Sequence, residues 1–67
     1  MKKTYDIQFN DDYSSNCKGF KATLRYCVGY ICNHNGTNHG YFKDYKGGMV
    51  SIICNENNKV VFNTKVL

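Results

Sequence analysis

The stretch "MVSIICNENNKVVFNTKV", residues 49–66, contains two strand-like runs around a turn signal. Residues 49–55 and 59–66 are rich in β-branched and aromatic side chains, and the intervening "ENN" is typical of a hairpin turn. Side chains alternate along a strand, so each run has an apolar face. That face is expected to consist of Val50, Ile52, Cys54, Val60, Phe62 and Val66. The other face carries Met49, Ile53 and Val61, which is more apolar than a solvated face requires.

A third strand is predicted at "TYDIQFN", residues 4–10. Tyr5, Ile7 and Phe9 alternate with polar residues, which is the pattern of a half-buried strand. The polar outer face favours an antiparallel sheet that is covered on one side only.

The period of the apolar residues changes between the first strand and the hairpin. At about 100° per residue, one face of a helix collects the apolar side chains of this segment. These are Phe20, Leu24, Cys27, Val28 and Ile31. The spacing predicts one amphipathic helix from Cys17 to Asn33 or His34, with Ser14, Ser15 or Asn16 as its N-cap. The "NG" pair at residues 35–36 supplies its C-terminal stop, and "YFKDY" at residues 41–45 fits one further helical turn.

The sequence therefore predicts one α+β domain over residues 1–67, of the order β-α-β-β. The helix is expected to pack on one face of a three-stranded, mainly antiparallel sheet. A sheet with the last strand in the middle makes every pair of neighbours antiparallel. The alternative places the first strand beside the second in parallel, as a right-handed crossover permits.

Composition indicates the compartment and the general class of partner. The chain has nine basic and five acidic residues, a net charge of +4, which favours acidic or nucleic-acid partners. The basic N-terminus lacks the apolar segment of a signal peptide, and no apolar run approaches the roughly 20 residues of a membrane span. A cytoplasmic protein with reduced cysteines is expected.

Cys27, Cys32, His34 and His39 lie close in the sequence and raise the question of a metal site. On a helix, positions 27 and 32 point in directions about 140° apart, and positions 27 and 34 are about 10 Å apart along the axis. A single zinc ion cannot bridge that separation with bonds of about 2.0–2.3 Å. No cofactor or metal is expected, and Cys32, His34 and His39 are the only set worth testing.

Catalytic motifs are not found. Cys17 is expected near the helix N-terminus, while both histidines belong to the opposite end, so no Cys–His pair forms. Asp11 and Asp12 have the pattern of turn residues, and "KGG" lacks the spacing of a phosphate-binding loop. We therefore expect a protein that is not an enzyme.

The segment "GYFKDYKGGMVSIICNENNKVVFNTKV", residues 40–66, resembles small uncharacterised proteins of phages and mobile elements in low-GC Gram-positive bacteria. Many anti-CRISPR and other anti-defence proteins are similar, being single cytoplasmic domains without catalytic motifs. The resemblance implies an inhibitor that blocks a bacterial immune complex by occupying its surface in the host cytoplasm.

These observations predict a non-catalytic binding or inhibitory protein that acts on a protein or ribonucleoprotein partner. The expected contacts are Tyr41, Phe42, Tyr45, Lys43, Lys46, Arg25 and Tyr26. The alternative for Phe42 and Tyr45 is that they fold back to close the sheet edge. A homodimer is expected through Met49, Ile53 and Val61. Two other functions stay open: direct nucleic-acid binding through Lys18, Lys21 and Arg25, and sequestration of a small ligand by His39 and tyrosines.

Overall fold

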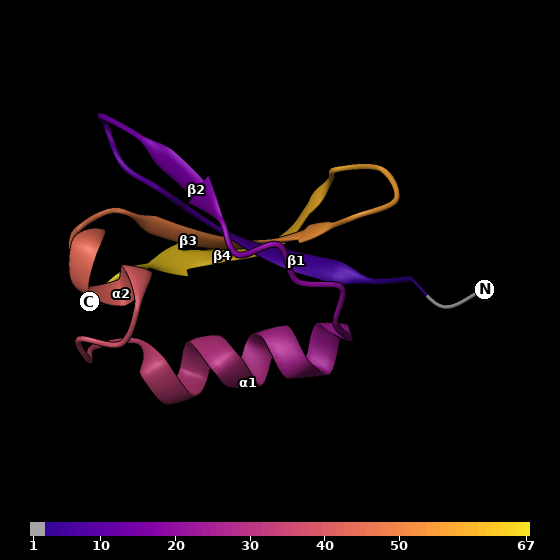
Figure 1. Cartoon of the computed structure of the whole chain (residues 1–67), viewed down its shortest axis with the longest axis horizontal. Coiled ribbons are helices and arrows are strands. Elements are labelled where there is room, and N and C mark those ends of the chain that lie inside the picture. The colour runs from indigo at the N-terminus through magenta and orange to yellow at the C-terminus, as the bar shows by residue number, and fades with distance from the viewer. Residues whose placement is uncertain (1–2) are drawn as a thin grey trace.

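The computed structural model describes residues 3–67 and has one helical layer beneath a single sheet (Figure 1). Its elements are, in chain order, β1 (Tyr5–Asn10), β2 (Ser15–Cys17), α1 (Leu24–His34), α2 (Tyr41–Asp44), β3 (Met49–Cys54) and β4 (Val60–Lys65). The predicted α+β fold is confirmed, as are the first strand, the end of the helix, the short helical turn and the C-terminal hairpin. The sheet has four strands, one more than predicted.

The four strands lie in the order β2-β1-β3-β4, and every neighbouring pair is antiparallel. The predicted order with the last strand in the middle is therefore wrong, because β1 lies beside β3. The alternative had this pair of neighbours right but its direction wrong, since the two strands are antiparallel. The physical reason is the unpredicted hairpin, which turns the chain back along β1 before the helix begins. As a result α1 runs in the same direction as β1, and β3 returns antiparallel to both (Figure 1).

The helix begins seven residues later than predicted, at Leu24 instead of Cys17. The preceding segment is extended along β1: Lys18 N–H donates to the carbonyl of Ile7 at 2.9 Å, and Ala22 forms a bridge with Tyr5. Gly19 has φ +80°, which does not fit a right-handed helix. Thr23 is therefore the N-cap, and its hydroxyl accepts from Tyr26 N–H at 3.0 Å.

A buried carboxylate holds the extended segment in place. Asp6 is only 6 % exposed, although the sequence pattern had put it on the polar face of the first strand. Its Oδ1 accepts hydrogen bonds from the backbone N–H groups of Ile7 at 2.7 Å and Phe20 at 2.8 Å. These bonds pair the Asp6 carboxylate, which would be costly to bury without hydrogen-bond partners. They also position Phe20 against α1.

The core lies between the sheet and the two helices. Its buried members include the predicted residues Ile7, Phe9, Cys27, Ile31, Val50, Ile52 and Val66. Val60 and Phe62 were also predicted to be buried, but they are 55 % and 38 % exposed. They belong to the edge strand β4, and the pairing of β4 with β3 shifts by one residue between Ile52 and Ile53.

The free edge of β4 is closed at its C-terminal end by Asn35. The side-chain amide of Asn35 donates to the carbonyl of Lys65 at 3.0 Å, and its oxygen accepts from Leu67 N–H at 2.9 Å. Asn35 also ends α1, donating its own N–H to the carbonyl of Ile31. This residue therefore joins the helix to the edge strand and occupies backbone groups that would otherwise be open to another strand.

Within residues 3–67, no helix has the length and apolar character needed to cross a membrane.

Candidate functional site

Four aromatic side chains form a continuous row along α1 and the loop that follows it. Tyr26, Tyr30 and His34 are spaced four residues apart, so they lie on the same side of the helix. Ring centroids are 6.4 Å apart for Tyr26 and Tyr30, and 4.7 Å apart for Tyr30 and His34. His39 stacks on His34 at 3.9 Å with an interplanar angle of 13°. We call these four residues the aromatic ladder.

Lys18 reaches the ladder from the extended segment before α1. Its Nζ lies 5.3 Å from the ring centroid of Tyr41, 5.9 Å from that of Phe20 and 6.0 Å from that of Tyr30. These distances are within the range of cation–π attraction. The contacts hold the half-buried Lys18 side chain beside the ladder, with its ammonium group close to these rings.

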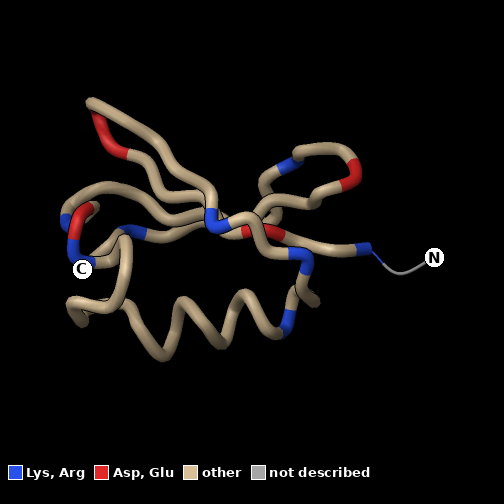
Figure 2. Tube along the Cα trace, viewed as in Figure 1, with Lys and Arg blue, Asp and Glu red and all other residues tan. Residues whose placement is uncertain are grey.

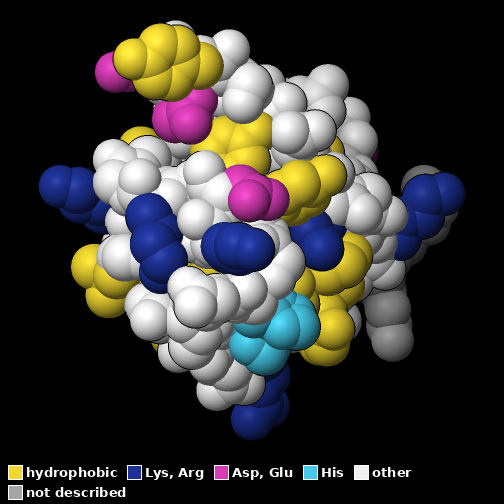
Figure 3. All heavy atoms as spheres, turned by 60° about the vertical axis from the view of Figure 1, so that its left-hand side comes forward, with side chains coloured by type: hydrophobic (Ala, Val, Ile, Leu, Met, Phe, Trp, Pro, Cys, Tyr) yellow, Lys and Arg dark blue, Asp and Glu magenta, His cyan; other side chains and the backbone are white. Residues whose placement is uncertain are grey.

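The ladder and its neighbours form a shallow surface, not a deep cavity. A hollow of about 250 Å³ is lined by Lys18, Gly40, Tyr41 and Asp44. Gly40 has φ +53°, and a Cβ there would lie 3.8 Å from Lys18 Nζ. Figure 3 shows the histidines below several basic side chains, with acidic side chains farther up the same view. The surface therefore combines rings with an excess of positive charge.

The predicted contact residues separate into exposed and buried groups. Arg25, Tyr26, Lys43 and Lys46 are exposed, Tyr26 by 55 %, and Tyr41 is half-buried. Lys46 is also tied to the fold, because its Nζ donates to the carbonyls of Thr37 at 3.1 Å and Leu67 at 3.2 Å. Five of the seven predicted contacts are thus accessible to a partner.

Phe42 and Tyr45 are core residues, so the prediction that they contact a partner is wrong for this conformation. Phe42 is fully buried and packs edge-on against Phe9, with centroids 4.8 Å apart. Tyr45 is 4 % exposed, and its hydroxyl bonds to Ser14 Oγ at 2.9 Å and accepts from Asn16 Nδ2 at 2.6 Å. The alternative is right that these rings fold back onto the sheet, but they pack against Phe9 on the inner strand β1 and not at the sheet edge.

Three features of the surface were missed from the sequence: the His34–His39 stack, the position of Lys18 among rings, and the contact of Phe20 with the ladder. Phe20 packs against Tyr26 and Tyr30 with centroids 5.8 Å and 5.3 Å away. The four-residue spacing of Tyr26, Tyr30 and His34 was a signal in the sequence that predicts a common helix side. No pattern in the sequence predicts that Lys18 lies beside these rings, because its position depends on the β1–β2 hairpin.

The predicted dimer residues lie on β3 and β4. Met49 is 36 % exposed, Val61 is 48 % exposed, and Ile53 is half-buried. Met49 and Ile53 are on the sheet face away from α1, but Ser51 lies between them on the same strand. Self-association through these residues stays a prediction.

The cysteines do not assemble into a metal site. Among residues 3–67, no group of three or more histidine, cysteine or acidic side chains is placed to hold a metal ion. Cys17 lies on β2 instead of at a helix N-terminus. Partial desolvation raises the pKa of the Cys17 thiol, and the nearby Asp6 carboxylate raises it further. Cys17 thus lacks the depressed pKa of an activated nucleophile.

Alkylation should therefore label the four thiols in a defined order. Cys32 is exposed on α1 and is expected to react first with iodoacetamide near pH 8. Cys17 is also exposed, but its raised pKa leaves less thiolate and slows the reaction. Cys27 and Cys54 are buried and should react only when the protein is unfolded by denaturant. Mass spectrometry of time points measures the order, and labelling of Cys17 before Cys32 would contradict it.

Together, these observations describe a small α+β protein with an aromatic and basic surface beside α1. No protein-family model matches the sequence, and comparison with curated proteins and with solved structures gives no match.

Proposed function

We propose that this protein is a non-catalytic binding protein that inhibits its partner by covering part of the partner's surface. The observation that carries the proposal is the aromatic ladder with Lys18 held among three neighbouring rings. Tyrosine and arginine are enriched among the few side chains that supply most of the binding energy in protein interfaces. Tyr41, Arg25 and Lys43 complete the proposed contact face.

Charge indicates the kind of partner. Of the five acidic residues, Asp6 is buried and Asp44 is the one that lines the hollow beside Lys18. The contact face therefore has a surplus of positive charge, which steers the protein towards an acidic protein or a ribonucleoprotein. A bacterial defence complex in the cytoplasm is the partner that agrees with the resemblance to anti-defence proteins.

The proposal is tested by replacing Tyr26 with alanine. Tyr26 is 55 % exposed, so its loss should leave the fold intact, while truncation of an interface tyrosine is expected to weaken partner binding roughly 30-fold. The measurement is quantitative pull-down from a bacterial host lysate, followed by affinity measurement with the captured partner. Asn63→Ala, on the exposed edge strand β4, is the matched control. Equal binding by both variants would overturn the assignment of this face.

Direct nucleic-acid binding is a second candidate, and the spacing of the ladder favours it. Single-stranded nucleic acids bind rows of aromatic rings, on which their bases stack, and nearby lysines, which contact their phosphates. Binding to random single-stranded RNA should then fall steeply as salt rises, and Tyr26→Ala should weaken it. Absence of RNA binding at low salt would exclude this candidate and leave the protein partner.

A further inference from the structure

The loop between β1 and β2 presents a nearly bare tyrosine. Tyr13 is 94 % exposed, more than any other large apolar side chain of the described residues. Asp11 and Asp12 precede it, and Figure 2 shows this acidic pair at the tip of the hairpin. We call residues 11–14 the tyrosine finger. Its side chain adds almost no burial to the fold, so its apolar ring is left for another surface.

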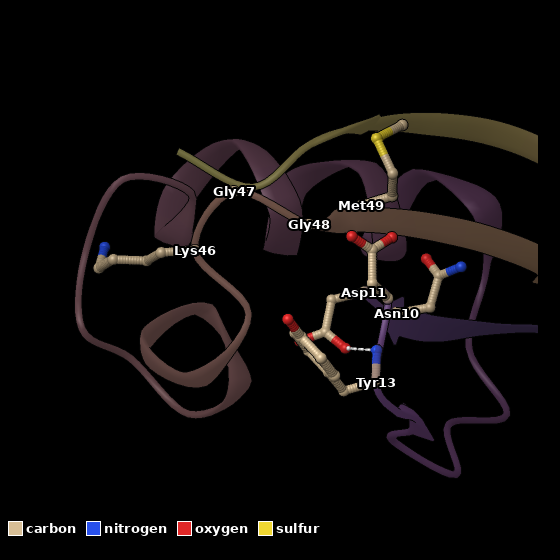
Figure 4. Close-up of a pocket in the computed structure, with 8 residues that line it drawn as sticks. Asn10, Asp11, Tyr13, Lys46, Gly47, Gly48 and Met49 are labelled. Atoms are coloured by element: carbon tan, nitrogen blue, oxygen red, sulfur yellow. Dashed lines mark hydrogen bonds between the residues drawn. The ribbon is translucent and has the colours of Figure 1, made fainter.

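Hydrogen bonds hold the finger in a defined turn. The Oδ1 atom of Asp11 accepts from the backbone N–H groups of Tyr13 and Ser14, both at 2.8 Å, and Figure 4 shows the first of these bonds. The N–H of Asp11 donates to the carbonyl of Ser14 at 3.0 Å. From the core, the hydroxyl of Tyr45 bonds to Ser14. A group held in one conformation before binding loses little entropy when it binds.

The opposite end of the molecule has a hollow that matches the finger. It has a volume of about 510 Å³ and is lined by Lys3, Thr4, Tyr5, Lys21, Thr23 and Leu24. Tyr5 and Leu24 supply apolar surface, and Lys3 and Lys21 are exposed cations beside it. We call it the basic hollow. It lies at the start of β1, whereas the finger follows the end of β1, so the two are separated along the length of the strand (Figure 1).

We propose that the tyrosine finger of one copy of this protein docks in the basic hollow of a second copy. The apolar ring of Tyr13 meets Tyr5 and Leu24, and the carboxylate of Asp12 meets Lys21. Charge complementarity selects a second copy, because the acidic finger and the basic hollow are both on this chain. The contact closes into a dimer when two copies exchange fingers and forms a chain otherwise.

This inference does not depend on the proposed function, since neither the finger nor the hollow includes the aromatic ladder. Sedimentation velocity of the wild-type protein should show self-association at high micromolar concentration that weakens as salt is raised. Tyr13→Ala is expected to weaken association roughly 30-fold, as for other central aromatic contacts. A monomer at every concentration and salt, or equal association of Tyr13→Ala, would overturn the inference.

A charge exchange gives the sharper test. Asp12→Lys and Lys21→Asp should each abolish self-association, because each puts like charges together. Asp11, not Asp12, carries the hydrogen bonds of the loop, so Asp12→Lys leaves the finger in shape. An equal mixture of the two variants should associate again, because every finger then meets a hollow of opposite charge. Single variants that still associate would show that self-association uses another surface. A mixture that stays monomeric would show that the finger does not dock in the hollow.

Discussion

Replacing Phe42 with alanine is expected to lower the free energy of unfolding more than truncation of any exposed residue. Phe42 is fully buried on the four-residue helix α2, and its ring packs on Phe9 in the centre of the sheet. Truncating a buried phenylalanine costs about 3–5 kcal/mol through lost burial and the cavity left behind. A domain of 67 residues has a total stability of about 3–10 kcal/mol. The free energy of unfolding, measured by urea titration followed by circular dichroism, should therefore fall by a third or more.

The matched control is Lys43→Ala, the next residue on the same helical turn. Lys43 is exposed, so its truncation should change the free energy of unfolding by less than about 0.5 kcal/mol. A small effect of Phe42→Ala would mean that α2 does not cover the sheet. The comparison also matters for function: loss of partner binding by a Phe42 variant would report unfolding, whereas Tyr26→Ala tests the contact face itself.

Much of the fold was predictable because several segments have an unambiguous period. The alternation of Tyr5, Ile7 and Phe9 identified β1, and the "ENN" turn identified the C-terminal hairpin. The "NG" pair marked the end of α1. In each case local chemistry and tertiary packing agree, which is when sequence patterns are informative.

The β1–β2 hairpin was not predictable in the same way. Ser15, Asn16 and Cys17 have weak strand propensity, and they pair with β1 because the turn at Asp11 returns the chain. Phe20 also fell on the apolar stripe of the predicted helix, although it reaches the helix from an extended segment. The missed hairpin gave the wrong helix start and the wrong strand order.

The candidate site was predicted only in part, because only some of its residues lie on elements with a clear period. Tyr26 and Arg25 lie on a real helix and are exposed, as expected from its period. Phe42 and Tyr45 lie on or beside a single turn, which is too short for a period to show which side is buried. The basic hollow joins residues from β1 with residues from the start of α1, and only the three-dimensional structure brings them together.

Replacing Gly48 with alanine is the second substitution that is expected to lower the free energy of unfolding strongly. A Cβ at this position would lie 2.5 Å from the carbonyl oxygen of Asn10 and 3.1 Å from both the Tyr45 carbonyl oxygen and the Asp11 Cβ. Two of these atoms belong to the backbone, so no side-chain rotation relieves the contact. Gly48 also bonds to Val66, accepting its N–H at 2.9 Å, and so cannot easily move away. Overpacking of this kind costs about 1–3 kcal/mol or more.

Gly29→Ala is the control, because it adds the same methyl group where nothing lies within 4 Å. Gly29 is inside α1, where alanine is favoured over glycine by about 0.8–1.0 kcal/mol. The two substitutions should therefore change the free energy of unfolding in opposite directions. The added methyl group would contact atoms of Asn10 and Asp11, at the base of the tyrosine finger. Gly48→Ala should therefore also disturb the finger and weaken self-association, even in the molecules that stay folded. Equal stability of the two variants would show that the hairpin does not pack against Gly48 as described.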